Sequence, residues 1–160
     1  MKKLITLIFI LLFISCKKNN ENGIGNNQYA VQDFGKLFSN TEKNNLTKKI
    51  LNFKKGTTNE ICIYTLDSLP ENIDEIEILA TKLAFDIGID TNQKNNGLLL
   101  LISEHDSEFA FVRGKDTKKF ITDSIRDSIS KNYLIPYFSE GEYYKGIINS
   151  LDAIMSVWDK

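Results

Sequence analysis

The sequence has few of the residues from which catalytic and metal centres are usually built. Its 160 residues include two cysteines, Cys16 and Cys62, and one histidine, His105. Because Cys16 closes an export-like segment, no disulfide framework can form and a zinc cluster is disfavoured. A hydrolase of the Ser-His-Asp or Cys-His type would have to use His105, which lies in a short polar turn. Cys62 falls inside an apolar run and is expected to be a small buried hydrophobic residue.

Basic side chains are not in excess either. The chain has 20 Lys and Arg against 21 Asp and Glu, and without Lys2 and Lys3 the count is 18 against 21, a net charge of −3. This balance argues against nucleic acid as the main partner. There is no internal repeat, no EF-hand spacing and no glycine-rich phosphate loop. About 130 residues follow the polar N-terminal stretch, which is enough for one domain.

The N-terminal apolar run is too short to cross a bilayer. Residues 4–14 are apolar apart from Thr6, they follow two lysines, and they precede Ser15 and Cys16. A membrane span needs ~20 apolar residues, so residues 1–15 are predicted to be a secretory signal peptide. Residues 16–28 are polar and rich in Asn and Gly, and we expect a flexible tether there. The domain itself is predicted over residues 29–160.

The sequence LFISC at residues 12–16 resembles a bacterial lipobox. This resemblance implies that Cys16 becomes the lipid-bearing first residue of an exported protein anchored to a bacterial membrane in the cell envelope. Several acyl chains together give stable anchoring, since each buried methylene contributes ~0.8 kcal/mol. The alternative is a plain signal peptide with an incidental cysteine.

The domain alternates between strand-like and helix-like patterns. Strands are predicted at residues 60–66, 97–103 and 108–113, the last two as a hairpin, with an extra short strand near 29–31. Helices are predicted after Ser39 to Gly56, from Pro70 to Gly88, over residues 117–131 and over residues 144–158. The order of these elements predicts an α/β fold, a Rossmann-like three-layer α-β-α sandwich around a small mixed sheet.

Local residue choices set the expected helix ends. Two capping boxes, each with a serine followed three residues later by a glutamate, are predicted at residues 39–42 and 139–142. Gly56 is expected at the position just after the first helix, and Pro136 is expected to break the third. Tyr143 and Tyr144 share helical spacing with inward residues and are expected to pack against the core.

Four motifs occur in one order along the domain. They are Val31-Gln32-Asp33 with Leu37-Phe38-Ser39, then Asn95-Asn96-Gly97 with four leucines, then Thr122-Asp123, and last the run from Pro136 to Ile147, PYFSEGEYYKGI. In this order and spacing they resemble the TPM domain, a fold shared by a thylakoid-lumen acid phosphatase and many bacterial envelope proteins. The resemblance covers residues 31–158. One departure is GKDTK at residues 114–118, where many members have G-x-G-L-E, so any contribution of that glutamate is lost.

The resemblance implies that loops around four polar residues, Asp33, Asp67, Asn96 and Asp123, converge near one cleft. Carboxylate and amide oxygens suit Ca²⁺ or Mg²⁺, and some TPM domains are held to bind calcium or to hydrolyse phosphate esters. The hypothesis is that the four side chains form a divalent-cation site, with further oxygens from Asp86, Asp90 and Asn92.

Each of these residues also has an ordinary structural interpretation. Asp33 is suited to cap a turn, Asp67 to form an Asx-turn, Asn96 to take a left-handed turn before a glycine, and Asp123 to be a solvated helix residue. Ligands of α/β sheets gather beyond the carboxyl ends of the strands. Asn96 precedes its strand, so it shares that end with Asp67 only if the strands are antiparallel or the loop folds over.

Two main functions follow from these observations. The first is a divalent-cation (calcium) binding module that assists other proteins of the envelope. The alternative is a metal-dependent, acid-type phosphatase acting on phosphate monoesters, for which the basic candidates are Arg113, Lys94 and Lys115. The sequence offers no obvious nucleophile, so the binding module is favoured. A structural lipoprotein without a ligand is the third interpretation.

Overall fold

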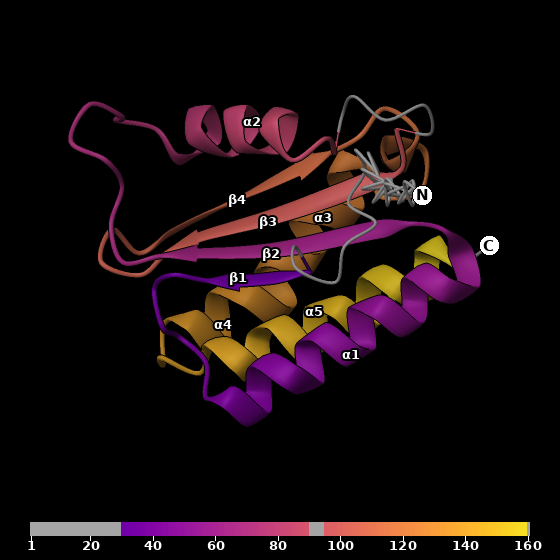
Figure 1. Ribbon diagram of the computed structural model, residues 1–160, viewed down its shortest axis with the longest axis horizontal. Coiled ribbons are helices and arrows are strands. Elements are labelled where there is room, and N and C mark those ends of the chain that lie inside the picture. Colours follow the sequence, from indigo (N-terminus) through magenta and orange to yellow (C-terminus); the bar gives the residue numbers. More distant parts are fainter. Residues whose placement is uncertain (1–29, 90–94, 160) are drawn as a thin grey trace, which may run out of the picture.

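A computed structural model of the protein describes residues 30–89 and 95–159 (Figure 1). The predicted signal peptide, the tether and Cys16 lie outside these ranges, as do Asp90, Asn92 and Lys94. None of the helices within the two ranges is long and apolar enough to cross a membrane.

The centre of the fold is a four-stranded mixed sheet in the order β1-β2-β3-β4. Its strands are β1 (Val31–Asp33), β2 (Glu60–Leu66), β3 (Gly97–Ser103) and β4 (Glu108–Arg113). The first three strands are parallel, and β4 returns antiparallel to β3 as a hairpin. The three main strands and the hairpin are confirmed at their predicted bounds. We refer to the side where β1, β2 and β3 finish as the carboxyl end of the sheet, and to the other side as the amino end.

Helix α1 (Asn40–Thr57) begins as the sequence predicts. The Glu42 N–H donates to the Ser39 hydroxyl at 3.3 Å, and the Ser39 N–H donates to the Glu42 carboxylate at 2.8 Å, so the first capping box is confirmed. The predicted end is wrong. The helix includes Gly56 and ends at Thr57, and the capping residue Thr58 takes the left-handed conformation with φ 66°.

Helix α2 (Ile76–Asp86) begins six residues later than predicted. Pro70 opens a turn instead, in which the Ile73 N–H donates to the Pro70 carbonyl at 2.9 Å. Residues 71–75 bury no side chain against the sheet, and the buried face of α2 begins only at Ile76, so no packing holds the earlier residues in a helix. The predicted end is close to the observed one, with Gly88 at φ 82°.

The predicted single helix over residues 117–131 is wrong. A 3₁₀ turn at Thr117–Lys119 comes first, and α3 (Asp123–Ile129) then begins after Thr122, whose hydroxyl accepts from the Ile125 N–H. The chain is fixed between them because the buried Thr117 hydroxyl donates to the Gly97 carbonyl at 2.9 Å. Phe120, expected to point inward, is 39% exposed.

One π-helical turn, Ser130–Leu134, joins α3 to α4 (Ile135–Phe138), and α5 (Tyr143–Trp158) follows. Pro136 lies in the first turn of α4, where a missing N–H is tolerated. The second predicted capping box is wrong, because the Ser139 hydroxyl donates back to the Pro136 carbonyl at 2.8 Å. Ser139 therefore ends α4 and does not begin α5.

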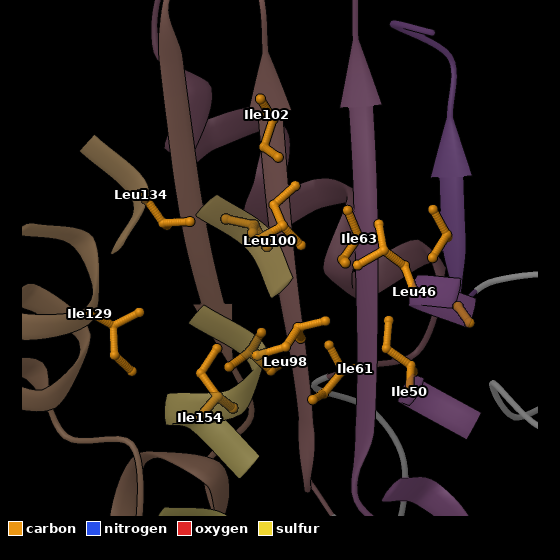
Figure 2. Packing of buried hydrophobic residues seen from close by; sticks show 14 of the residues in the cluster. Leu46, Ile50, Ile61, Ile63, Leu98, Leu100, Ile102, Ile129, Leu134 and Ile154 are labelled. Atoms are coloured by element: carbon orange, nitrogen blue, oxygen red, sulfur yellow. The ribbon is translucent and has the colours of Figure 1, made fainter. Parts of the chain in front are cut away.

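The helices form two layers, one on each face of the sheet (Figure 1). Helix α2 covers one face, and α1, α3, α4 and α5 cover the other, which confirms the predicted three-layer α/β fold. Figure 2 shows the larger core between the sheet and the second layer, with Leu46 and Ile50 of α1 facing the strands. Alternate residues of β3 point to opposite faces: Leu98, Leu100 and Ile102 enter this core, while Leu99 and Leu101 face α2.

Candidate functional site

Strand direction divides the predicted cation ligands between the two ends of the sheet. Asp33 is the last residue of β1 and Asp67 directly follows β2, so both lie at the carboxyl end. Asn96 directly precedes β3, whose first residue is level with the first residue of β2. Seven residues of strand separate the two ends by about 20 Å. The prediction that the four residues converge near one cleft is therefore wrong.

Asn96 joins the starts of two strands. Its side-chain N–H groups donate to the Thr58 carbonyl at 2.9 Å and to the Asn59 side-chain oxygen at 3.2 Å. Its own carbonyl accepts from the Glu60 N–H at 3.1 Å. The left-handed residue of this turn is Asn95, with φ 46°, and not Asn96. Asn96 therefore holds β2 and β3 together at the amino end.

Asp123 is also at the amino end, where it pairs with arginine. Its Oδ1 lies 2.6 Å from Nη2 of the buried Arg113 and 3.4 Å from Nη1 of Arg126. The hydrogen bond from Arg113 and the charge of that guanidinium lower the pKa of Asp123, and Arg126 adds to this effect. Two positive groups at the same oxygen oppose the binding of a divalent cation there.

The guanidinium group of Arg113 is held by two hydrogen bonds, one of which is the contact with Asp123. Besides the pair with Asp123, its Nη1 donates to the Ile121 carbonyl at 2.6 Å. These two bonds fix the chain where α3 begins. The guanidinium is therefore occupied in holding the fold, and it lies at the opposite end of the sheet from Asp67.

At the carboxyl end, Asp33 organises the turn into α1. Its Oδ1 accepts from the Thr65 hydroxyl at 2.6 Å and from the Leu37 N–H at 2.9 Å, and its Oδ2 accepts from the Phe38 N–H at 3.2 Å. Three donors already neutralise part of the charge of this carboxylate. The structural role of Asp33 as a turn cap is confirmed.

Asp67 lies beside the turn that joins β3 to β4. The His105 N–H donates to the Asp67 carbonyl at 2.9 Å. Within this turn, the Asp106 carboxylate accepts from the Ser103 hydroxyl at 2.6 Å and from the Leu69 N–H at 2.7 Å, and these two bonds lower the pKa of Asp106. The loop after β2 and the hairpin turn are thus tied together, which brings Asp67 close to the turn that carries Asp106.

Asp106 and Ser103 were missed by the sequence reasoning. The available signal was a serine followed three residues later by an aspartate in a tight turn, a spacing at which the two side chains can form a hydrogen bond.

Among the described residues, no group of three or more His, Cys, Asp or Glu side chains is placed to hold a metal ion. The predicted set of four ligands therefore does not fit a single cation.

A cavity of about 270 Å³ opens near the hairpin turn, and we call it the aromatic pocket. It is lined by Ile102, Ser103, Ser107, Glu108, Phe109, Ile135, Phe138, Ser139 and Tyr143. The Phe138 ring lies 5.7 Å from the Phe109 ring and 4.9 Å from the Tyr143 ring, centroid to centroid. Tyr143 was expected only to pack, and it both packs against the core and lines this pocket.

The architecture and the order of the motifs can be compared with known families. The model of the TPM domain matches residues 31–157. The chain belongs to the TPM domain family. No match to this TPM domain is found among curated proteins.

Solved structures share the fold of this TPM domain. The solution NMR structure of the N-terminal domain of a protein from P. gingivalis has a TM-score of 0.76 and 24% identity, with 85% of each chain covered. The NMR structure of the BA42 protein from Bizionia argentinensis has a TM-score of 0.65 and 20% identity, covering 76% of this chain and 81% of that one. The N-terminal domain of the cg2496 protein from Corynebacterium glutamicum has a TM-score of 0.64 and 16% identity, with coverages of 82% and 80%. These likenesses show the fold alone.

Proposed function

We propose that this TPM domain is a binding module and not a hydrolase. It is held to a bacterial membrane through a lipid on Cys16, binds a divalent cation weakly, and assists other proteins of the cell envelope. The observation that carries the proposal is the separation of the two ends of the sheet. Carboxylates and the aromatic pocket gather at the carboxyl end, whereas Arg113 is bound to Asp123 at the amino end.

The cation part of the proposal is confined to the carboxyl end. Asp67 and Asp106 lie on two segments that are hydrogen-bonded to each other, and Asp33 already accepts three bonds. Ca²⁺ takes 6–8 oxygen ligands. A site with only two carboxylates, completed by water and main-chain oxygens, is therefore expected to bind it with low affinity. We therefore expect dissociation constants of about 10⁻⁴ to 10⁻³ M, as in extracellular modules.

Calorimetric titration of Ca²⁺ and Mg²⁺ into a soluble fragment, residues 17–160, tests this part. The fragment keeps every described element. Asp67→Asn is expected to weaken binding at least about fivefold, because it removes one of two carboxylate ligands. Asp127→Asn is the matched control, since Asp127 pairs with Arg126 on α3. No saturable heat at millimolar metal, or equal weakening by the control, contradicts the cation site.

Arg113, the main basic candidate for stabilising a phosphoryl group, is not placed to serve a phosphatase site beside Asp67. A hydrolase of this kind needs positive charge beside the transferred phosphoryl group, and Arg113 lies buried on the other side of the domain from Asp67. We expect no turnover of para-nitrophenyl phosphate above background at pH 5 or pH 7 with Ca²⁺ or Mg²⁺ present. Turnover that Asp67→Asn abolishes would reverse the ranking of the two functions.

The lipid anchor has its own test. Mass spectrometry of the mature chain, recovered from membranes of a bacterial host, is expected to find a diacylglyceryl-modified N-terminal Cys16. Cys16→Ser is expected to release the protein from the membrane fraction. A mature chain that begins elsewhere and carries no lipid contradicts the anchor and favours a plain signal peptide.

A further inference from the structure

The size of the aromatic pocket limits what can occupy it. Pockets for drug-sized molecules and cofactors occupy ~300–1,000 Å³, and this one occupies about 270 Å³. Its volume lies just below the lower limit of that range, which favours an occupant about the size of an amino-acid side chain. Ile135, half of whose surface is exposed, lies at the pocket and offers apolar contact to whatever enters.

The three aromatic rings that line the pocket are inclined to one another. The planes of Phe109 and Phe138 are inclined by 85°, and those of Phe138 and Tyr143 by 49°. Aromatic faces carry negative potential and attract ammonium and guanidinium groups. The same stretch of chain already shows this contact, since the ammonium group of Lys145 lies 5.2 Å from the centre of the Tyr137 ring.

Carboxylates add negative charge around the aromatic pocket. Glu108 belongs to its lining, and the described residues that line it include no Lys or Arg. Burial and the charge of Glu104 raise the pKa of Tyr143, so Glu104 lies close enough to act on the phenol at the pocket. Asp106 is in the same turn, and its hydrogen bonds keep it charged. Lys145 does not cancel this charge, because it pairs with Glu142 at 2.8 Å.

We propose that the aromatic pocket binds a lysine or arginine side chain from an exposed segment of a partner protein. The aliphatic stem packs against Ile102 and Ile135, the cationic head lies on the aromatic faces, and Glu108 supplies the counter-charge. This inference rests on the proposed function as a binding module and names the chemistry of its partner. It does not depend on the divalent cation.

The test uses NMR titration of the soluble fragment, residues 17–160, with three capped heptapeptides. All have serine and leucine flanks, and the central residue is lysine, acetyl-lysine or arginine. The lysine and arginine peptides are expected to bind saturably, with amide shifts centred on Ser107, Glu108 and Tyr143. Acetylation is expected to weaken binding about five- to tenfold, because it removes the positive charge.

Two variants test the contacts without disturbing the core. Glu108→Gln is expected to weaken the lysine peptide about two- to fivefold, as an exposed ion pair would. Ile135→Ala removes apolar contact at an exposed position and is expected to weaken both charged peptides. Glu77→Gln on α2 is the matched control and is expected to leave binding unchanged.

Several outcomes would overturn the inference. These are equal binding of the acetyl-lysine peptide, shifts that map away from the pocket, the absence of saturable binding at millimolar peptide, or tighter binding of phosphocholine than of the lysine peptide. The last result would assign the pocket to a lipid headgroup. If the fragment binds a cation while the peptides fail, the pocket inference falls and the binding module stands. If peptides bind while calorimetry shows no cation, only the cation part of the proposed function falls.

Discussion

Two glycines with equal space around them should respond in opposite ways to alanine. A Cβ atom added at Gly56 or at Gly141 meets nothing within 4 Å. Their backbones differ, because Gly56 lies inside α1 whereas Gly141 has a φ of 74°. The structure therefore predicts that Gly56→Ala stabilises the domain and that Gly141→Ala destabilises it.

The magnitudes follow from the backbone alone. Alanine in place of a helical glycine lowers the free energy of the folded state relative to the unfolded state by about 0.5–1 kcal/mol. At Gly141 the left-handed conformation costs an alanine about 1–2 kcal/mol, offset by about 0.4–1 kcal/mol from the stiffer unfolded chain. The net loss is about 0.5–1 kcal/mol. Each change is expected to move the melting temperature by roughly 2–4 °C, in opposite directions.

Urea unfolding of the soluble fragment measures both effects. The buried Trp158, the one tryptophan in the sequence, reports unfolding by its fluorescence. An unchanged dependence of the unfolding free energy on urea would show that only stability has changed. If Gly56→Ala destabilises the fragment as much as Gly141→Ala does, then Gly56 is left-handed and α1 ends where the sequence pattern placed it. The reasoning from the structure would then be refuted.

Three further predictions concern local contacts. Thr58→Gly relieves a left-handed threonine and is expected to stabilise the domain by about 0.5–1 kcal/mol in urea unfolding, and a loss would contradict the observed end of α1. Asp123→Asn is expected to lower the melting temperature at pH 7. Because Arg113 lowers the pKa of Asp123, this contribution is present above the unfolded pKa of about 3.9. The gap to the wild type should therefore close as the pH falls below 4, and a constant gap would speak against the pair. Burial raises the pKa of Cys62 to about 12, so a disulfide reagent should label it at pH 8 only after unfolding, and rapid native labelling would contradict its burial.

The sheet and the start of α1 were predictable because local residues determine them. Three runs rich in β-branched, leucine or aromatic residues predicted the three main strands, and a serine–glutamate pair predicted the first cap. Residues 117–138 were not predictable from periodicity. The first part of this segment is fixed by side-chain bonds that periodicity does not show, from Thr117 to Gly97 and from Arg113 to Ile121. The late start of α2 has a different cause, since residues 71–75 bury no side chain against the sheet.

The candidate site was only partly predictable, because a list of polar loops carries no strand direction. The position of Asp67 at the carboxyl end followed from its place after an apolar run. The position of Asn96 depended on whether β2 and β3 are parallel, and the parallel pairing put it at the amino end. The aromatic pocket combines the hairpin with α4 and α5, which are distant from the hairpin in sequence, so no local pattern could have placed Phe109 beside Phe138.

A substitution at Asn96 tests whether the predicted cation ligands really lie at opposite ends of the sheet. If Asn96 were a cation ligand, Asn96→Asp would add a negative charge to the site and tighten calcium binding. In the structure its side-chain N–H groups donate to two oxygens, on Thr58 and Asn59. A carboxylate there would lose both bonds and face those acceptors, which should cost about 1–3 kcal/mol of stability. We expect urea unfolding to show this loss while calorimetry shows an unchanged calcium affinity. Tighter calcium binding in this variant would indicate that Asn96 is a cation ligand. It would then contradict the separation of the predicted ligands between the two ends of the sheet, on which the proposed function rests.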